Sequence, residues 1–296
     1  MPVDISLAGA CDSHVHVVGP LATFPQSATR SYTAAEASLE VLQALGAPEG
    51  ISRFVIVQAS FYGTDNSCML AALDKLGPNG RGVVVADLKN DLKNATPPLL
   101  DQYEIRGVRG LRVNLYSKSL LFAPERICDL VQSAMNNVPA KRWHVEIIAP
   151  LSLLLNAYKI IADSRVPVVL DHYALPGAPS PHSSEARRLL ELIALPHVWL
   201  KLSAPYRVLA DPLATNPPAD WLAALLHAAP DRCIWGSDWP HTPLDADQRS
   251  RDEISPYRKI SYSRLFQDFI RALPDASLAR LILVENPQRL YGFSPS

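Results

Sequence analysis

Eight short runs of apolar and β-branched residues recur along the chain of 296 residues, each separated from the next by a segment of helical length. Continuous apolar strands indicate a parallel sheet covered by helices, because such strands are buried on both faces. Eight strand-helix units in a chain of about 250 residues or more predict a (β/α)8 barrel, and a doubly wound sheet is the alternative α/β fold. The predicted strands are Ala10–Val17, Arg53–Ala59, Gly82–Asp87, Val108–Asn114, Trp143–Ile148, Val166–Asp171, Val198–Ser203 and Cys233–Ser237.

Between the predicted strands, apolar residues recur at spacings of three and four, which is typical of helices that pack one face against a sheet. The 26 prolines are spread through the chain and mark no linker, so residues 1–296 are predicted to form one distorted barrel domain. The predicted helices are Ala34–Leu45, Ser67–Leu76, Ile127–Asn136, Ser152–Ala162, Ser184–Leu195, Pro218–Ala228 and Tyr262–Leu273, followed by a helix broken by a turn over Ala276–Tyr291.

Two histidines, His14 and His16, stand at the end of the first predicted strand. Side chains alternate along a strand, so both imidazoles point to the same side. Paired imidazoles either bind a metal ion or donate hydrogen bonds to a substrate oxygen that gains charge. Asp238 follows the last predicted strand and therefore lies at the same rim, where barrel enzymes carry their active sites.

Other polar residues also fall at the carboxyl ends of predicted strands. Asp171 and His172 are neighbours at the end of the sixth strand, so alternation predicts that only one enters the barrel, and we expect it to be His172. The remaining rim residues are Ser60, Arg112, Asn114, Ser203 and Arg207.

The composition excludes several classes of partner. The net charge is -1 and the basic residues are scattered, which argues against a nucleic-acid surface. The chain shows neither a secretory leader nor an apolar run long enough to cross a bilayer, so we expect no membrane contact. The four cysteines form no disulfide or metal-binding pattern, which is typical of a cytoplasmic protein, and the sequence leaves open whether the chain forms a homo-oligomer.

The set His14, His16, His172 and Asp238 resembles the amidohydrolase superfamily of (β/α)8 barrels. The segments 12–20, 55–60, 107–114 and 236–241 are similar to the 2-pyrone-4,6-dicarboxylate lactonase-like family within it. The resemblance implies hydrolysis of a carboxylate-bearing lactone, either that pyrone or a related one such as a sugar-acid lactone, in the catabolism of aromatic or sugar acids. It also implies that Asp238 activates water while the three imidazoles stabilise the oxyanion.

The same resemblance implies residues that hold the substrate carboxylates, at Tyr32, Ser60, Arg112 and Arg207. A guanidinium suits a planar carboxylate because it donates two parallel hydrogen bonds. The sequence departs from the family at two places: Lys118 replaces a second arginine and is the fifth expected substrate-binding residue, and the fifth strand has no tyrosine. A lysine is a point charge that can still pair with a carboxylate while relaxing geometric selection, so the sequence leaves open which lactone is the substrate.

The four residues of the central set can also bind Zn²⁺, which would make the protein a metal-dependent decarboxylase of an aromatic or related acid. The superfamily's metal enzymes usually add a lysine on strand four or a histidine on strand five. Here the fourth strand has Arg112 and no lysine, and His144 lies at the start of its strand. We therefore predict no cofactor and no metal, and we consider a binding barrel without catalysis the third alternative.

Overall fold

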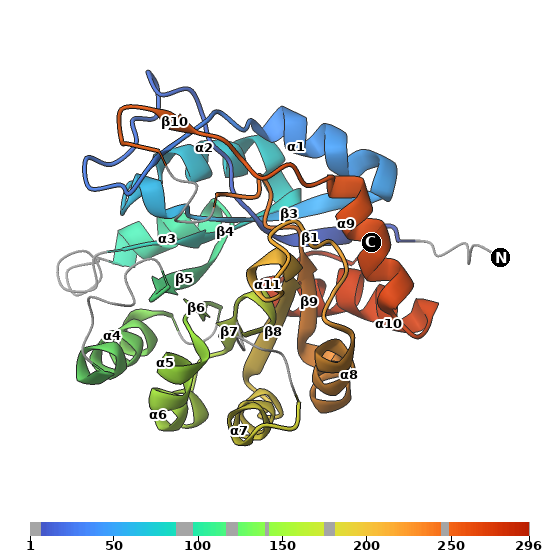
Figure 1. Ribbon diagram of the computed structural model, residues 1–296. Helices are drawn as coiled ribbons and strands as arrows, with labels where there is room; N and C mark the ends of the chain where they lie inside the picture. The colour runs from blue at the N-terminus through green and yellow to red at the C-terminus, as the bar shows by residue number, and fades with distance from the viewer. Residues whose placement is uncertain are drawn as a thin grey trace.

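The computed structural model describes residues 7–86, 97–116, 124–139, 142–174, 181–243 and 249–295. Eight parallel strands form one sheet in chain order, seen at the centre of Figure 1 with the helices around it, and the predicted (β/α)8 barrel is confirmed. The strands are β1 (Ala10–Val15), β3 (Ile51–Val57), β4 (Gly80–Val84), β5 (Val108–Asn114), β6 (His144–Ile148), β7 (Val168–Leu170), β8 (Val198–Ser203) and β9 (Cys233–Gly236).

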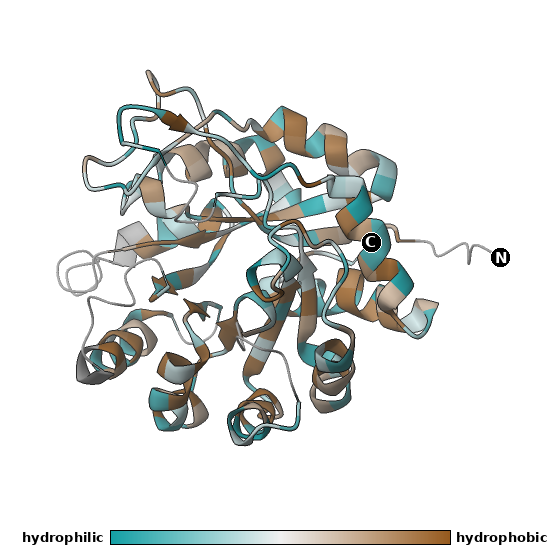
Figure 2. Ribbon diagram, viewed as in Figure 1, coloured by the Kyte–Doolittle hydropathy of each residue, from teal (hydrophilic) through white to brown (hydrophobic). Residues whose placement is uncertain are grey.

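Most of the helices lie around the outside of the barrel (Figure 1), and those drawn in colour show apolar residues beside polar ones (Figure 2). Among the described residues, no helix is both long and apolar enough to cross a bilayer. The helices are α1 (Leu39–Gly46), α2 (Ser67–Leu76), α3 (Pro97–Ile105), α4 (Pro124–Asn137), α5 (Leu151–Asn156), α6 (Tyr158–Ala162), α7 (Ser184–Ile193), α8 (Ala219–Ala228), α9 (Tyr262–Ala272), α10 (Ala276–Arg280) and α11 (Asn286–Tyr291).

The first predicted helix begins too early in the sequence. The Ser38 hydroxyl accepts a hydrogen bond from the Val41 amide, so α1 starts at Leu39. Residues 33–34 instead form the short strand β2 (Thr33–Ala34), which pairs with β10 (Ile254–Ser255) far along the chain.

Several strands begin or end a few residues from the predicted positions, and two helical segments differ in their continuity. The segment predicted as Ser152–Ala162 is divided at Ala157 into α5 and α6. Between α10 and α11, the predicted turn is a π-helical stretch, Leu281–Glu285, so this end of the chain stays helical. The predicted strand end Asp87 lies outside the described residues.

Two hydrogen bonds join the first and last strands beyond their regular ends. The Asp238 amide donates to the His14 carbonyl at 2.8 Å, and the His16 amide donates to the Trp239 carbonyl at 2.8 Å. This register places Asp238 between the two histidines. The barrel is therefore nearly closed at the same place where the polar rim residues gather.

Gly236 allows β9 to approach β1 this closely. A Cβ atom on residue 236 would lie 2.6 Å from the His14 Cβ and 2.8 Å from the His14 amide nitrogen. We expect Gly236→Ala to destabilise the fold by about 1 to 3 kcal/mol, because the added methyl group overpacks a buried seam. Chemical denaturation measures the change in the free energy of unfolding. A variant as stable as the native protein would show that the contact between β1 and β9 can accommodate a methyl group.

Candidate active site

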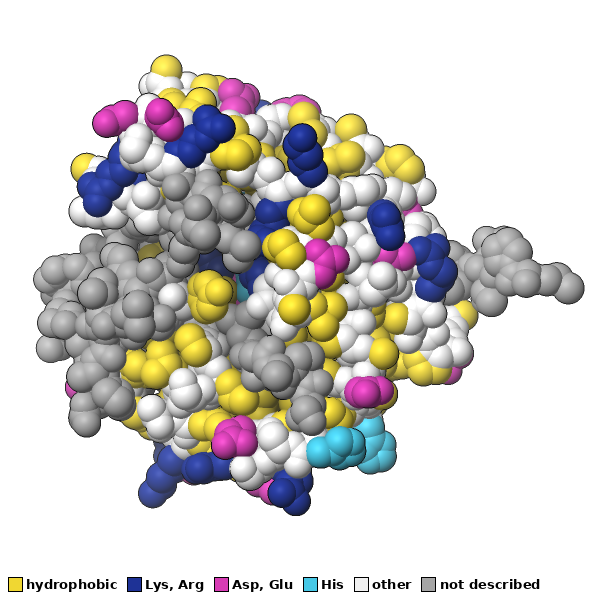
Figure 3. Space-filling view, in the orientation of Figure 1, with side chains coloured by type: hydrophobic (Ala, Val, Ile, Leu, Met, Phe, Trp, Pro, Cys, Tyr) yellow, Lys and Arg dark blue, Asp and Glu magenta, His cyan; other side chains and the backbone are white. Residues whose placement is uncertain are grey.

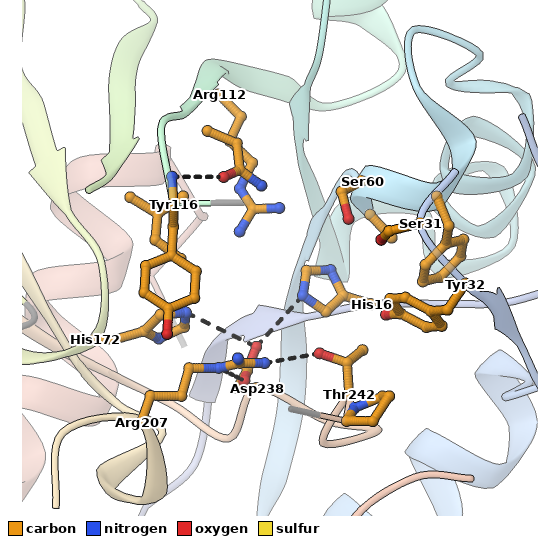
Figure 4. Close-up of a pocket in the computed structure, with 15 residues that line it drawn as sticks. His16, Ser31, Tyr32, Ser60, Arg112, Tyr116, His172, Arg207, Asp238 and Thr242 are labelled. Atoms are coloured by element: carbon orange, nitrogen blue, oxygen red, sulfur yellow. Dashed lines mark hydrogen bonds and ion pairs between the residues drawn. The ribbon is translucent and has the colours of Figure 1, made fainter. Parts of the chain in front are cut away.

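The carboxylate of Asp238 is the centre of the candidate site. Its Oδ1 atom lies 3.6 Å from His14 Nε2, 3.4 Å from His16 Nε2 and 4.0 Å from His172 Nε2. Figure 4 shows His16 and His172 on opposite sides of Asp238. Oδ1 has no hydrogen-bond partner among the described residues, although it is buried. An unpaired buried carboxylate oxygen is costly, so Oδ1 marks this position as a candidate functional centre.

The other oxygen of Asp238 is firmly held. Oδ2 accepts hydrogen bonds from Arg207 Nε at 2.7 Å and from the Tyr206 hydroxyl at 2.8 Å. Burial by itself raises the pKa of this carboxyl, but the Arg207 charge and the nearby imidazoles outweigh it and hold the pKa well below its usual range. Asp238 is therefore a carboxylate at neutral pH, with one oxygen fixed and the other without a hydrogen-bond partner among the described residues.

Two of the imidazoles are held neutral by burial. Burial lowers the pKa of His172 to about 4 and that of His14 well below its ordinary value. The outer ring nitrogens are fixed as well: His16 Nδ1 donates to the Val57 carbonyl at 2.8 Å, and His172 Nδ1 lies 2.8 Å from the Ser203 hydroxyl. The rings of His16 and His172 are thus each oriented by a neighbouring group.

The backbone around the site is strained. Positive φ angles of non-glycine residues cost energy and persist where surrounding structure enforces them. Within the part of the chain that the structure describes, they occur only near this rim, at His172, Tyr173, Ala174, Ala204, Asp238 and His241.

This strain explains why one expectation was wrong. Strand β7 ends at Leu170, and His172 has a φ of 51°, so the alternation of side chains does not continue through Asp171 and His172. Both side chains are buried inside the barrel: Asp171 Oδ1 lies 3.2 Å from His14 Nδ1, and His172 faces Asp238.

A cavity of about 200 Å³ opens beside Asp238, somewhat smaller than the roughly 300 Å³ at which the usual range for ligand sites begins. In the space-filling view, basic side chains and a small area of histidine lie in the hollow near the centre of this face (Figure 3). Its polar lining comes from His16, Ser31, Tyr32, Ser60, Arg112, Asn114, Tyr116, His172, Arg207, Asp238 and Thr242.

Four of the five predicted substrate-binding residues, Tyr32, Ser60, Arg112 and Arg207, line this cavity (Figure 4). Burial raises the pKa of Tyr32 to about 12, so its hydroxyl remains a hydrogen-bond donor. Arg207 also donates to Thr242 Oγ1 at 2.7 Å, so it is bound to the protein as well as facing the cavity. Lys118 lies outside the described residues.

Sequence reasoning missed a charged layer beneath the site. Along β5, β6 and β8, the residues on either side of Arg112, Glu146 and Lys201 pack in the core outside the barrel, so these three side chains point inside. Arg112 lies 3.9 Å from Glu146, and Lys201 forms an ion pair with Glu146. The sequence did carry a signal for this layer, namely a charged residue inside an apolar strand. Such a residue must be buried together with a partner.

Two groups of buried residues lie close enough together to hold a metal ion, His14 with His16 and Asp238, and His14 with Asp171 and His172, but the groups around them do not suit one. A coordinating imidazole needs a lone pair toward the metal and donates its other N–H to an acceptor. His16 meets this requirement through Val57, but His14 Nδ1 lies 3.1 Å from the Lys201 ammonium, which has no lone pair to accept with. The Arg207 guanidinium on Asp238 opposes a further positive charge.

Known proteins resemble this chain over nearly its whole length. The chain is 33% identical to the 2-pyrone-4,6-dicarboxylate hydrolase of Comamonas testosteroni, an alignment that covers 96% of this chain and 90% of that protein. It is 30% identical to the 4-sulfomuconolactone hydrolase of Rhizobium radiobacter, with 96% and 90% covered.

A solved structure from Pseudomonas putida, assigned as a 2-pyrone-4,6-dicarboxylic acid hydrolase, superimposes with a TM-score of 0.72 at 26% identity. The superposition covers 97% of this chain and 99% of the other. The amidohydrolase family model matches residues 11–293. The chain therefore belongs to the amidohydrolase family.

Proposed function

We propose that the protein hydrolyses a lactone that carries carboxylate or similar anionic groups, and that it does so without a metal ion. The observation that carries the proposal is the unpaired Oδ1 of Asp238, which faces three imidazole nitrogens beside a cavity lined by two arginines. This arrangement supplies a base, hydrogen-bond donors and a binding site for negative charge. The two named relatives act on anionic lactones.

In the first step, a water molecule that hydrogen-bonds to Asp238 Oδ1 gives a proton to the carboxylate. His16 Nδ1 donates to the Val57 carbonyl, so Nε2 is the ring nitrogen that helps to orient this water. The water oxygen attacks the lactone carbonyl carbon, and the electrons of the C=O bond move to the carbonyl oxygen. General base catalysis of this kind contributes about 10²- to 10⁴-fold.

The resulting oxyanion requires hydrogen-bond donors that are fixed in advance. We assign this role to His172, with the Ser203 hydroxyl donating to Nδ1 so that Nε2 carries the proton, and to His14. When the intermediate collapses, the ring C–O bond breaks and the leaving oxygen takes the proton from Asp238. The new carboxylic acid loses its proton at neutral pH, so each turnover releases one proton to solution.

Arg112 recognises the anionic substituent in this proposal. Its side chain is buried at the cavity and donates to the Gln58 carbonyl at 3.0 Å, while Nε has no hydrogen-bond partner among the described residues. We expect Arg112→Met to lower kcat/KM at least about tenfold for an anionic lactone, because a charge-assisted hydrogen bond contributes about 1.5 to 3 kcal/mol. The same variant should hydrolyse a neutral analogue of the same ring almost as well as the native protein, and equal losses on both substrates would exclude charge recognition by Arg112.

A substrate panel tests the proposed function. Proton release is followed with 2-pyrone-4,6-dicarboxylate, 4-sulfomuconolactone, sugar-acid lactones and neutral lactones as substrates. We expect turnover of at least one anionic lactone and much weaker turnover of the neutral ones. Hydrolysis of neutral lactones at equal rates would remove the anionic substrate class, and no hydrolysis of any lactone would remove the proposal.

A further inference from the structure

Lys201 is fully buried inside the barrel, directly below the histidine pair. Its exposed fraction is 0%, and its neighbours Leu200 and Leu202 pack in the core outside the barrel. The ammonium forms an ion pair with Glu146, lies 3.1 Å from His14 Nδ1 and lies 3.7 Å from Asp171 Oδ1. No step of the proposed hydrolysis uses it directly.

The charges around Lys201 balance. Two cations, Lys201 and Arg112, face two carboxylates, Glu146 and Asp171, with Arg112 Nη2 at 3.7 Å from Asp171 Oδ2. Burial and the Asp171 charge act to raise the pKa of Glu146, but the Lys201 charge and neighbouring groups hold it below its ordinary value. A buried charge is tolerated only when it is paired in this way.

The contact between Lys201 and His14 fixes the position of a proton. An ammonium donates hydrogen bonds and accepts none, so His14 Nδ1 must be the acceptor and its proton must lie on Nε2. Asp171 is the competing partner, because its Oδ1 lies 3.2 Å from the same nitrogen. However, neither oxygen of Asp171 has a partner with hydrogen-bond geometry among the described residues, so the lone pair of Nδ1 is directed to Lys201.

We infer that Lys201 is a positioning residue that holds His14 in its Nε2–H form. This form supplies a hydrogen-bond donor toward Asp238 and the reacting oxygen, and it removes the lone pair that a divalent metal ion would require. Without Lys201, the proton of His14 can lie on Nδ1 and be donated to Asp171. The lone pair of Nε2 is then free to bind a metal ion. The catalytic role of this hydrogen-bond donor rests on the proposed metal-free hydrolysis. The position of the proton itself is tested without any substrate.

The proton positions can be read directly by NMR of protein labelled with ¹⁵N on its histidine rings. We expect His14 to show the Nε2–H pattern and His16, which donates to Val57 from Nδ1, to show the opposite pattern. The two signals are assigned with His14→Gln and His16→Gln. An Nδ1–H pattern for His14 in the native protein would overturn the inference.

A metal titration provides the second test. In the double variant Lys201→Met with Glu146→Gln, which removes both charges of the ion pair, His14 should change to its Nδ1–H form. The affinity for Zn²⁺, measured by competition with a chromogenic chelator, should rise at least about tenfold, the size of effect that residues contacting metal ligands usually have. Unchanged zinc affinity in a folded variant would overturn the inference, and if the variant does not fold, the native NMR pattern decides.

Arg53→Met is the matched control for removal of a buried cation. Arg53 is buried at the start of β3 and donates to the carbonyls of Gly9 and Ser294, away from the histidines. We expect its zinc affinity and the His14 pattern to equal those of the native protein. An equal rise in zinc affinity in this control would show that the effect is general and overturn the role of Lys201. Neither test contains a lactone. If no lactone is hydrolysed but His14 shows the Nε2–H pattern, only the proposed function is rejected.

Discussion

Asp238→Asn should keep the fold and lower kcat by about 10²- to 10⁴-fold, because an amide cannot accept a proton from water. The orientation of the new side chain follows from the donors around it. Arg207 and Tyr206 both donate to Oδ2, so the amide oxygen will take that position and the NH2 group will replace Oδ1. The atom that should take the proton is then a hydrogen-bond donor.

Asp268→Asn is the matched control for this variant. Asp268 is also a buried carboxylate, but it lies on α9 and accepts hydrogen bonds from Thr215 and Arg271. Steady-state kinetics and thermal unfolding of both variants separate chemistry from stability. Turnover within a few-fold of native in a folded Asp238→Asn variant would exclude Asp238 as the base.

Arg207→Met should move the acid limb of the kcat/KM profile to higher pH by about 1 to 3 units, because an adjacent opposite charge lowers a carboxyl pKa by that amount. The base acts only as a carboxylate, so activity is present above the pKa of Asp238 and is lost as the pH falls through it. In the native protein this pKa is well below its usual range, and Arg207 is the largest contribution that lowers it. Removing Arg207 leaves the effect of burial, which raises the pKa.

Arg207→Lys separates the effect of losing the positive charge from the effect of changing the cavity lining. A lysine keeps the positive charge near Oδ2, so its acid limb should lie nearer the native one than that of Arg207→Met. Rate profiles from pH 8 down to the lowest pH at which the proteins stay folded, with a permanently charged sulfonated lactone, avoid titration of the substrate. An acid limb in Arg207→Met at the native position would show that Arg207 does not control Asp238.

Much of the barrel could be predicted because buried parallel strands are continuous apolar runs. Val108–Asn114 and Val198–Ser203 have the predicted bounds. The short strand pair β2 and β10 could not be predicted, because each strand has two residues and the pairing joins residues about 220 positions apart. Helix α3 begins with two prolines and has little amphipathic pattern, so periodicity did not indicate it.

At the site, the strand ends brought His14, His16, His172 and Asp238 together as predicted. The hydrogen-bond partner of each of these groups depends on three-dimensional positions, which the sequence pattern does not give. Residue spacing did not reveal that Arg207 binds the proposed base. Lys201 was overlooked although a charged residue inside an apolar strand indicates a buried pair, and only the three-dimensional structure shows that it reaches His14.

The most direct test of metal-free hydrolysis is turnover of an anionic lactone by protein whose metal content has been measured. We expect full activity with far less than one metal ion per chain, and no loss of activity after prolonged incubation with a strong chelator. Stoichiometric zinc in the active protein, with activity lost on chelation and restored by added zinc, would contradict the account.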